Sequence, residues 1–151
     1  MSVRPKIHRL QSRYFEANRD EYYRRLHEIS ADGAWTEWII FFLKAVEEQA
    51  KENQDKASKM LELYERKKTV FQEITRSQFA IYALDSIFCK PVFRSSDFTA
   101  QDQIPAPTAR RILKELRDNQ ILVTIREPKG RKSSILAFAE LLNITEGKKL
   151  F

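Results

Sequence analysis

Apolar residues recur at helical spacing through the first half of the chain. Between Asn18 and Gly33, the residues Tyr22, Leu26 and Ile29 fall at i, i+4 and i+7, which is typical of one face of an amphipathic helix. Asn18 stands where an N-cap is expected, and Gly33 is suited to end the helix. The pattern therefore predicts a first helix that begins near Asn18 and ends near Gly33.

The helical pattern resumes after Gly33 and continues to about residue 75, with one polar interruption, KENQDK, at 51–56. Two helices or one long kinked helix would both satisfy it. Phe41 lies outside the apolar stripe that contains Trp38 and Phe42, so the helix is apolar on more than one face. This predicts burial against a partner, with Trp38, Phe41 and Phe42 as interface residues. The stripe itself, predicted to face a core, consists of Trp35, Trp38, Ile39, Phe42, Leu43 and Val46, then Ala57, Met60, Leu61, Tyr64 and Phe71.

The pattern changes at Arg76. A helix is predicted to end before Pro91, and a short helix follows for which Ser95 or Ser96 offers a cap. After a turn at 102–106, Pro107 suits the first position of a third helix. In this third helix a buried face is predicted at spacing i, i+3, i+4 and i+7, made by Ala109, Ile112, Leu113 and Leu116.

A β-hairpin is predicted directly after the third helix. The segment 121–127 is rich in β-branched residues, PKGRK forms a turn around Gly130, and SSILAF has strand character. Three helices followed by a hairpin with a basic loop is the order of a winged helix-turn-helix. We therefore expect a mainly α fold: a helical segment at 1–75 and a winged helix-turn-helix domain with a small β-hairpin at 76–151.

The net charge of +6 is distributed unevenly. Residues 1–75 hold 14 Lys and Arg against 13 Asp and Glu, whereas residues 76–151 hold 13 against 8. A basic excess confined to one half favours an anionic partner, although mild excesses also occur on ordinary protein surfaces.

The buried face of the third helix decides where its charges go, because helical neighbours repeat every 3.6 residues. Its cations must lie on or beside the outer face, next to the basic hairpin loop. A helix in the major groove beside a basic wing can grip the backbone of a DNA duplex. The predicted DNA-binding residues are Thr108, Arg110, Arg111, Lys114, Arg117, Lys129, Arg131 and Lys132.

A solvated or protein-facing surface accounts for the same charges. Exposed helix faces need charge for solubility, and Glu115 and Asp118 stand at the spacing that pairs them with Arg111 and Lys114. Asn and Gln, which suit the reading of adenine, occur only at the far end of the helix. The sequence thus favours backbone contacts over base-specific ones.

No catalytic constellation is found in the sequence. Three isolated glycines cannot form a phosphate-binding loop, and the two histidines stand apart from any nucleophile. Cys89 is the only cysteine, which excludes an intrachain disulfide and a zinc site built from several cysteines, and we expect it to be a small buried residue. We therefore expect no enzyme activity, no metal and no cofactor.

Nothing in the sequence predicts a membrane association. The longest apolar run, WIIFFL at 38–43, is far shorter than the roughly 20 residues of a membrane-spanning helix. The N-terminus carries no apolar signal region. A cytoplasmic protein is expected.

The stretch YFEANRDEYYRRLHEI, followed by DGAWTEWIIFFLKAVEEQA, resembles the C-terminal part of Fic family proteins. In that family this segment closes the helical core just after the catalytic loop, and many members then carry a winged-helix tail. The resemblance implies that a full-length relative would transfer AMP from ATP to protein hydroxyls. The matching residues are Asn18, Arg19, Tyr22, Tyr23, Leu26, Gly33, Trp35, Trp38, Phe41, Phe42 and Leu43.

The catalytic loop of the Fic family, with its histidine and GNGR core, does not occur in this sequence, so no catalytic residue is carried over. We therefore expect a truncated Fic tail, either a shortened gene or a fragment. Two functions stay open: a DNA-binding or regulatory winged-helix module whose partner is double-stranded DNA, and an interaction module that forms a homodimer or positions a Fic catalytic core or another protein.

Overall fold

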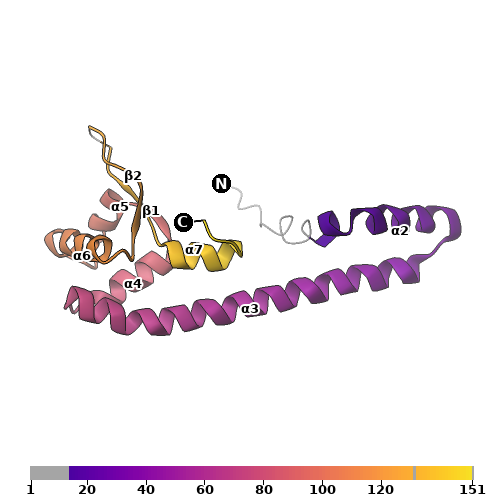
Figure 1. Cartoon of the computed structure of the whole chain (residues 1–151), viewed down its shortest axis with the longest axis horizontal. Helices are drawn as coiled ribbons and strands as arrows, with labels where there is room; N and C mark the ends of the chain where they lie inside the picture. The colour runs from indigo at the N-terminus through magenta and orange to yellow at the C-terminus, as the bar shows by residue number, and fades with distance from the viewer. Residues whose placement is uncertain (1–13, 131, 151) are drawn as a thin grey trace. The chain divides into compact units, whose positions relative to one another are not determined.

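The computed structural model describes residues 14–130 and 132–150. The fold is mainly helical with a small antiparallel sheet, as predicted (Figure 1). The three strands lie in the order β1-β3-β2. The chain forms two compact units, one up to Asp55 and one from Lys56 onward. The elements are α2 (Arg19–Asp32), α3 (Trp35–Thr75), α4 (Ala80–Cys89), β1 (Val92–Arg94), α5 (Ser95–Thr99), α6 (Ala106–Asp118), β2 (Val123–Arg126), β3 (Ile135–Ala137) and α7 (Ala139–Glu146).

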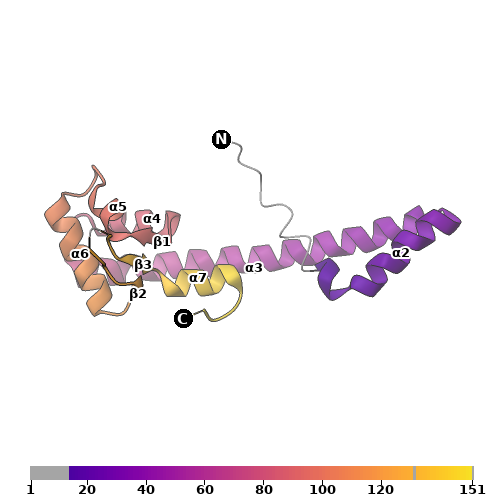
Figure 2. The ribbon, with the colours of Figure 1, turned by 90° about the horizontal axis from the view of Figure 1, so that it is seen from above.

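In the first unit, α2 runs back beside the first half of α3 (Figures 1 and 2). The helix ends at Gly33, as predicted, and the chain reverses there. The φ of Gly33 is 65°, in the left-handed region that glycine adopts without strain. Asn18 occupies the N-cap position of α2, as predicted, but its side chain makes no capping hydrogen bond. Residues 14–17 are themselves helical, and the Asn18 amide donates instead to the carbonyl of Tyr14, at 2.9 Å.

Of the two arrangements left open by the sequence, the structure has the single long helix: α3 is continuous over 41 residues. The polar KENQDK segment lies within it, because polar residues are compatible with a helix where it faces water. The part of α3 from Lys56 onward packs into the core of the second unit. The boundary between the two compact units therefore lies inside α3, and not at residues 75 and 76, where the sequence pattern changes.

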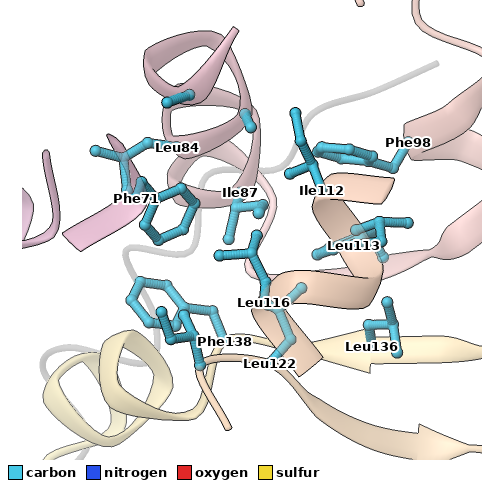
Figure 3. Close-up of a cluster of buried hydrophobic side chains, with 14 of the residues drawn as sticks. Phe71, Leu84, Ile87, Phe98, Ile112, Leu113, Leu116, Leu122, Leu136 and Phe138 are labelled. Atoms are coloured by element: carbon cyan, nitrogen blue, oxygen red, sulfur yellow. The ribbon is translucent and has the colours of Figure 1, made fainter. Parts of the chain in front are cut away.

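The core of the second unit is built from the end of α3, from α4, α5 and α6, and from the sheet and α7 (Figure 3). Ala109, Ile112, Leu113 and Leu116 of α6 are buried in it, as predicted. Burying one face of α6 fixes the rotation of that helix about its axis. Cys89, in contrast, was expected to be buried and is exposed, because the buried face of α4 passes through Ala83, Leu84 and Ile87.

The hairpin forms as predicted, and the sheet also contains β1, which the sequence pattern did not indicate. Lys129 and Lys132 exchange two backbone hydrogen bonds of 3.0 Å across the tip, where Gly130 has a φ of 57°. The register between β2 and β3 shifts at Ile125, which leaves that residue as a bulge. No helix within the described ranges combines the length and apolar character that crossing a membrane requires.

The end of α6 is held by a Schellman motif that positions the hairpin. Gln120 has a φ of 59°, and its N–H donates to Arg117 O, while the N–H of Ile121 donates to Leu116 O. Ile121 is buried with Leu116, which completes the apolar contact of this motif. The left-handed position is thus occupied by a side-chain-bearing residue rather than by glycine.

We expect Gln120→Gly to raise the free energy of unfolding by about 0.5–1 kcal/mol, because glycine adopts a positive φ without the steric cost of a Cβ atom. Urea unfolding followed by circular dichroism measures the change. Asn119→Gly is the matched control: Asn119 has a φ of −91°, so glycine brings no relief there. A loss of stability in Gln120→Gly would contradict the interpretation.

A candidate nucleic-acid interface on the second unit

Three cations lie along one side of α6. Arg110, Lys114 and Arg117 follow the spacing i, i+4 and i+7, and all three are exposed. We call them the cation stripe. Their position follows from the burial of the opposite side of the same helix, so their direction is set by the core rather than by their own contacts.

The cation stripe borders a groove of about 260 Å³ that lies between α6, α5 and the base of the hairpin. Leu113 and Leu136 contribute the apolar part of its lining, and both are buried. Hydroxyl groups contribute much of the rest, so we call this feature the serine groove. The hydroxyl residues that line it are Ser95, Ser96, Thr99, Ser133 and Ser134.

Hydrogen bonds join the two walls that carry these hydroxyls. Ser134 Oγ donates to Ser95 Oγ, and Ser96 Oγ and Ser133 Oγ lie 2.9 Å apart. The backbone N–H of Ser95 also donates to Ser134 O, at 3.0 Å. The prediction that Ser95 or Ser96 caps α5 is wrong: no side chain caps this helix, and Arg94 occupies the cap position. The two serines instead fasten α5 to the hairpin.

The charged side chains that line the serine groove are all cations: Arg110, Lys114 and Arg117. No carboxylate is among its lining residues, and within 14–130 and 132–150 no ion pair involves the cation stripe. The predicted pairing of Lys114 and Arg111 with Glu115 and Asp118 is not found in these ranges either. Most of the hydroxyl groups are engaged within the protein: Ser134 donates to Ser95, and Thr99 donates to the carbonyl of Ser96. The unneutralised cations are therefore the main groups that could contact a phosphate.

The charges of α2 are arranged differently. Arg24 and Arg25 both pair with Glu21 and Glu28, one helical turn away on either side. The hydrogen bonds from Arg24 and Arg25 hold the pKa of the Glu21 carboxyl below its usual value. Arg24 and Arg25 are thus neutralised locally, whereas the cations of the cation stripe are not.

Arg111 lies on the other side of α6 and has a structural partner. Its Nη1 atom donates to the carbonyl of Thr75, the last residue of α3, at 2.7 Å. Thr75 is fully buried, and the next residue, Arg76, has a positive φ of 45° that ends the helix. A guanidinium at this place satisfies a free carbonyl and is favourable for the helix dipole. Arg111 thus anchors α6 to α3 and does not belong to the cation stripe.

The other predicted DNA-binding residues do not all lie at the serine groove. Thr108 is half-buried and does not line the serine groove. Lys129 and Lys132 are exposed beside the hairpin tip. Arg131 lies outside the described residues. Serine residues of the groove were not predicted as site residues, since only the pairing of β1 with β3 brings Ser95 and Ser134 together.

The predicted interface residues belong to the aromatic core of the first unit. Phe41 is 7% exposed, and its ring contacts those of Tyr14, Phe15 and Trp38 at centroid distances of 5.8–6.0 Å. Trp38 and Phe42 are half-buried. The expectation that Phe41 forms a second outward face is therefore wrong, because residues 14–17 and α2 cover the arc of α3 on which it lies.

No group of three or more His, Cys, Asp or Glu in the described part of the chain is arranged to hold a metal ion. No protein-family model matches the chain. The resemblance to Fic proteins therefore stays a prediction.

We expect Arg111→Met to lower the free energy of unfolding by about 1–2 kcal/mol, because it leaves the Thr75 carbonyl without its charged donor. Arg110→Met is the matched control on the same helix, and its effect should stay within about 0.5 kcal/mol. Urea unfolding of both variants makes the comparison. Equal losses would show that the Arg111 contact contributes nothing specific.

Proposed function

We propose that the second unit is a winged helix-turn-helix domain that binds the sugar-phosphate backbone of double-stranded DNA. The order of its elements supports this proposal: α4, β1, α5 and α6 precede a hairpin made by β2 and β3. In such domains the helix at the place of α6 enters the major groove and the hairpin loop lies beside it as a wing.

The observation that carries the proposal is the unpaired cation stripe along the hydroxyl-lined serine groove. Keeping three cations close together on one helix, with no carboxylate in the groove, costs repulsion that an anionic partner would relieve. Each phosphate of a DNA backbone accepts hydrogen bonds from guanidinium, ammonium and hydroxyl groups alike. Lys129 and Lys132 extend the positive surface onto the hairpin.

Contacts with the backbone are favoured over the reading of base sequence. Asn119 and Gln120, whose side chains could pair with adenine, stand at the C-terminal end of α6. Asn119 donates its side-chain amide to Glu115 O, and Gln120 occupies the left-handed position of the helix end. We therefore propose a binding mode in which affinity depends little on sequence and strongly on salt.

The resemblance to the Fic family gives this proposal a biological context. A DNA-binding tail of a protein adenylyltransferase would be a regulatory module that places the enzyme on the chromosome. This role is a further proposal and rests on the residues from Asn18 to Leu43 that match the family.

Five described cations are proposed to contact DNA phosphates: Arg110, Lys114, Arg117, Lys129 and Lys132. Five such contacts should give a slope of log affinity against log salt of about −4 to −5. Replacing the cation stripe by glutamine should reduce the slope to about −2 and weaken binding to unrelated duplexes alike. Fluorescence anisotropy with labelled duplexes across a salt series measures both effects.

A control variant removes the same number of charges from the first unit: Arg24, Lys44 and Lys51 to Gln. Its slope should equal that of the unchanged chain, because these residues lie outside the proposed site. Absence of duplex binding at about 50 mM salt would refute the proposal, as would an equal effect of the two triple variants.

A further inference from the structure

The first half of α3 is apolar over a wide arc, and only part of this arc is covered. Phe41 and Ala45 are buried on the side toward α2 and residues 14–17. The neighbouring side was predicted to face a core, and the structure leaves it open to solvent. Its large apolar residues, which we call the apolar row, are Trp35, Ile39, Ile40, Leu43 and Val46, each 45–60% exposed.

The size of the apolar row matches what a protein interface requires. Five large side chains, each about half exposed, present on the order of 500 Å² of apolar surface, which is as large as the biggest patches on typical monomers. A standard interface takes roughly 800 Å² from each partner, of which a little over half is apolar. The apolar row alone would supply that apolar share.

A hollow of about 230 Å³ adjoins the C-terminal end of the apolar row. Phe15 and Phe42 line one part of it, and the turns of α3 from Ala45 to Asn53 line the rest. Its lining is mostly apolar. Trp35, at 60% exposed, stands at the opposite end of the same row. One face of a single helix thus carries both a projecting ring and a hollow.

We propose that the apolar row is the interface with a second copy of this chain, packed antiparallel along the first half of α3. A twofold axis near residue 41, the midpoint of the row, brings Trp35 of one copy level with residue 47 of the other, since both are six residues from 41. Residue 47 does not line the hollow itself, but its level along the helix axis is the middle of the stretch of α3 that does, from Phe42 to Asn53. Each tryptophan would then enter the hollow of the other copy, and the contact repeats itself by symmetry.

The residues of this interface are separate from those proposed to bind DNA, because they belong to the first unit and include none of the cations of α6. A self-complementary arrangement also explains why the second copy is the occupant: the projection and the hollow lie at equal distances from the midpoint of the row. A partner with a different sequence would not require that spacing.

Sedimentation velocity of the full chain at rising concentration should show a monomer–dimer equilibrium. Leu43→Asp, near the proposed axis, should weaken the dimer at least 10-fold, because it buries an unpaired carboxylate in the interface. Trp35→Ala should weaken it as well, by emptying the hollow. Both residues are exposed in the single chain, so helix content by circular dichroism should not change.

Leu61→Asp is the matched control. Leu61 lies on the same helix, is 63% exposed and belongs to the second unit, outside the proposed contact. The dimer should keep its affinity in this variant. A chain that stays monomeric, a dimer that Leu43→Asp leaves intact, or a dimer that Leu61→Asp weakens equally would each overturn the proposal; duplex binding by α6 can be measured separately in every variant.

Discussion

Burial of one face of α6 is the constraint on which the rest of the second unit depends. Ala109, Ile112 and Leu116 are fully enclosed, and Leu113 nearly so, so the helix cannot rotate about its axis without exposing them. At roughly 25 cal/mol for each Å² of apolar surface, such a rotation would cost several kcal/mol. The direction of every charge on α6 is therefore decided by apolar contacts. The electrostatic repulsion among the three cations of the cation stripe is too weak to rotate α6 out of this orientation.

The same rotation gives two adjacent arginines different roles. Arg110 and Arg111 are neighbours in sequence, and 100° of helix separates their side chains. Arg111 thereby reaches the buried end of α3, where it donates to the Thr75 carbonyl, and Arg110 lines the serine groove. Charge counts along the sequence treat these residues as equivalent. Their energetic contributions differ, since one satisfies a carbonyl of the fold and the other has no anionic partner among the described residues.

Elements with a strong apolar period were predictable from the sequence, and contacts between distant segments were not. The buried residues of α6, the end of α2 at Gly33 and the hairpin at Gly130 follow from local pattern and glycine chemistry. The three-residue strand β1 has too short a pattern to be distinguished, and with it the approach of the two serine pairs was missed. In α3 the apolar arc is wider than one packing partner, so periodicity could not indicate which side α2 would cover. The predicted stripe is therefore only partly confirmed: Phe71 is buried and Trp38 and Phe42 are half-buried, whereas its other members in the first half of α3 are exposed.

The two candidate surfaces differ in the force that would drive them, and this difference decides how they can cooperate. A contact through the apolar row would depend on removal of apolar surface from water, which added salt does not screen. Phosphate binding by the cation stripe would release counterions and weaken steeply with salt. If both occur, each dimer carries two DNA-binding units, and binding of the first raises the effective concentration of the second. The slope with salt would then exceed that of one unit, while the dimer would persist at salt concentrations that release the DNA.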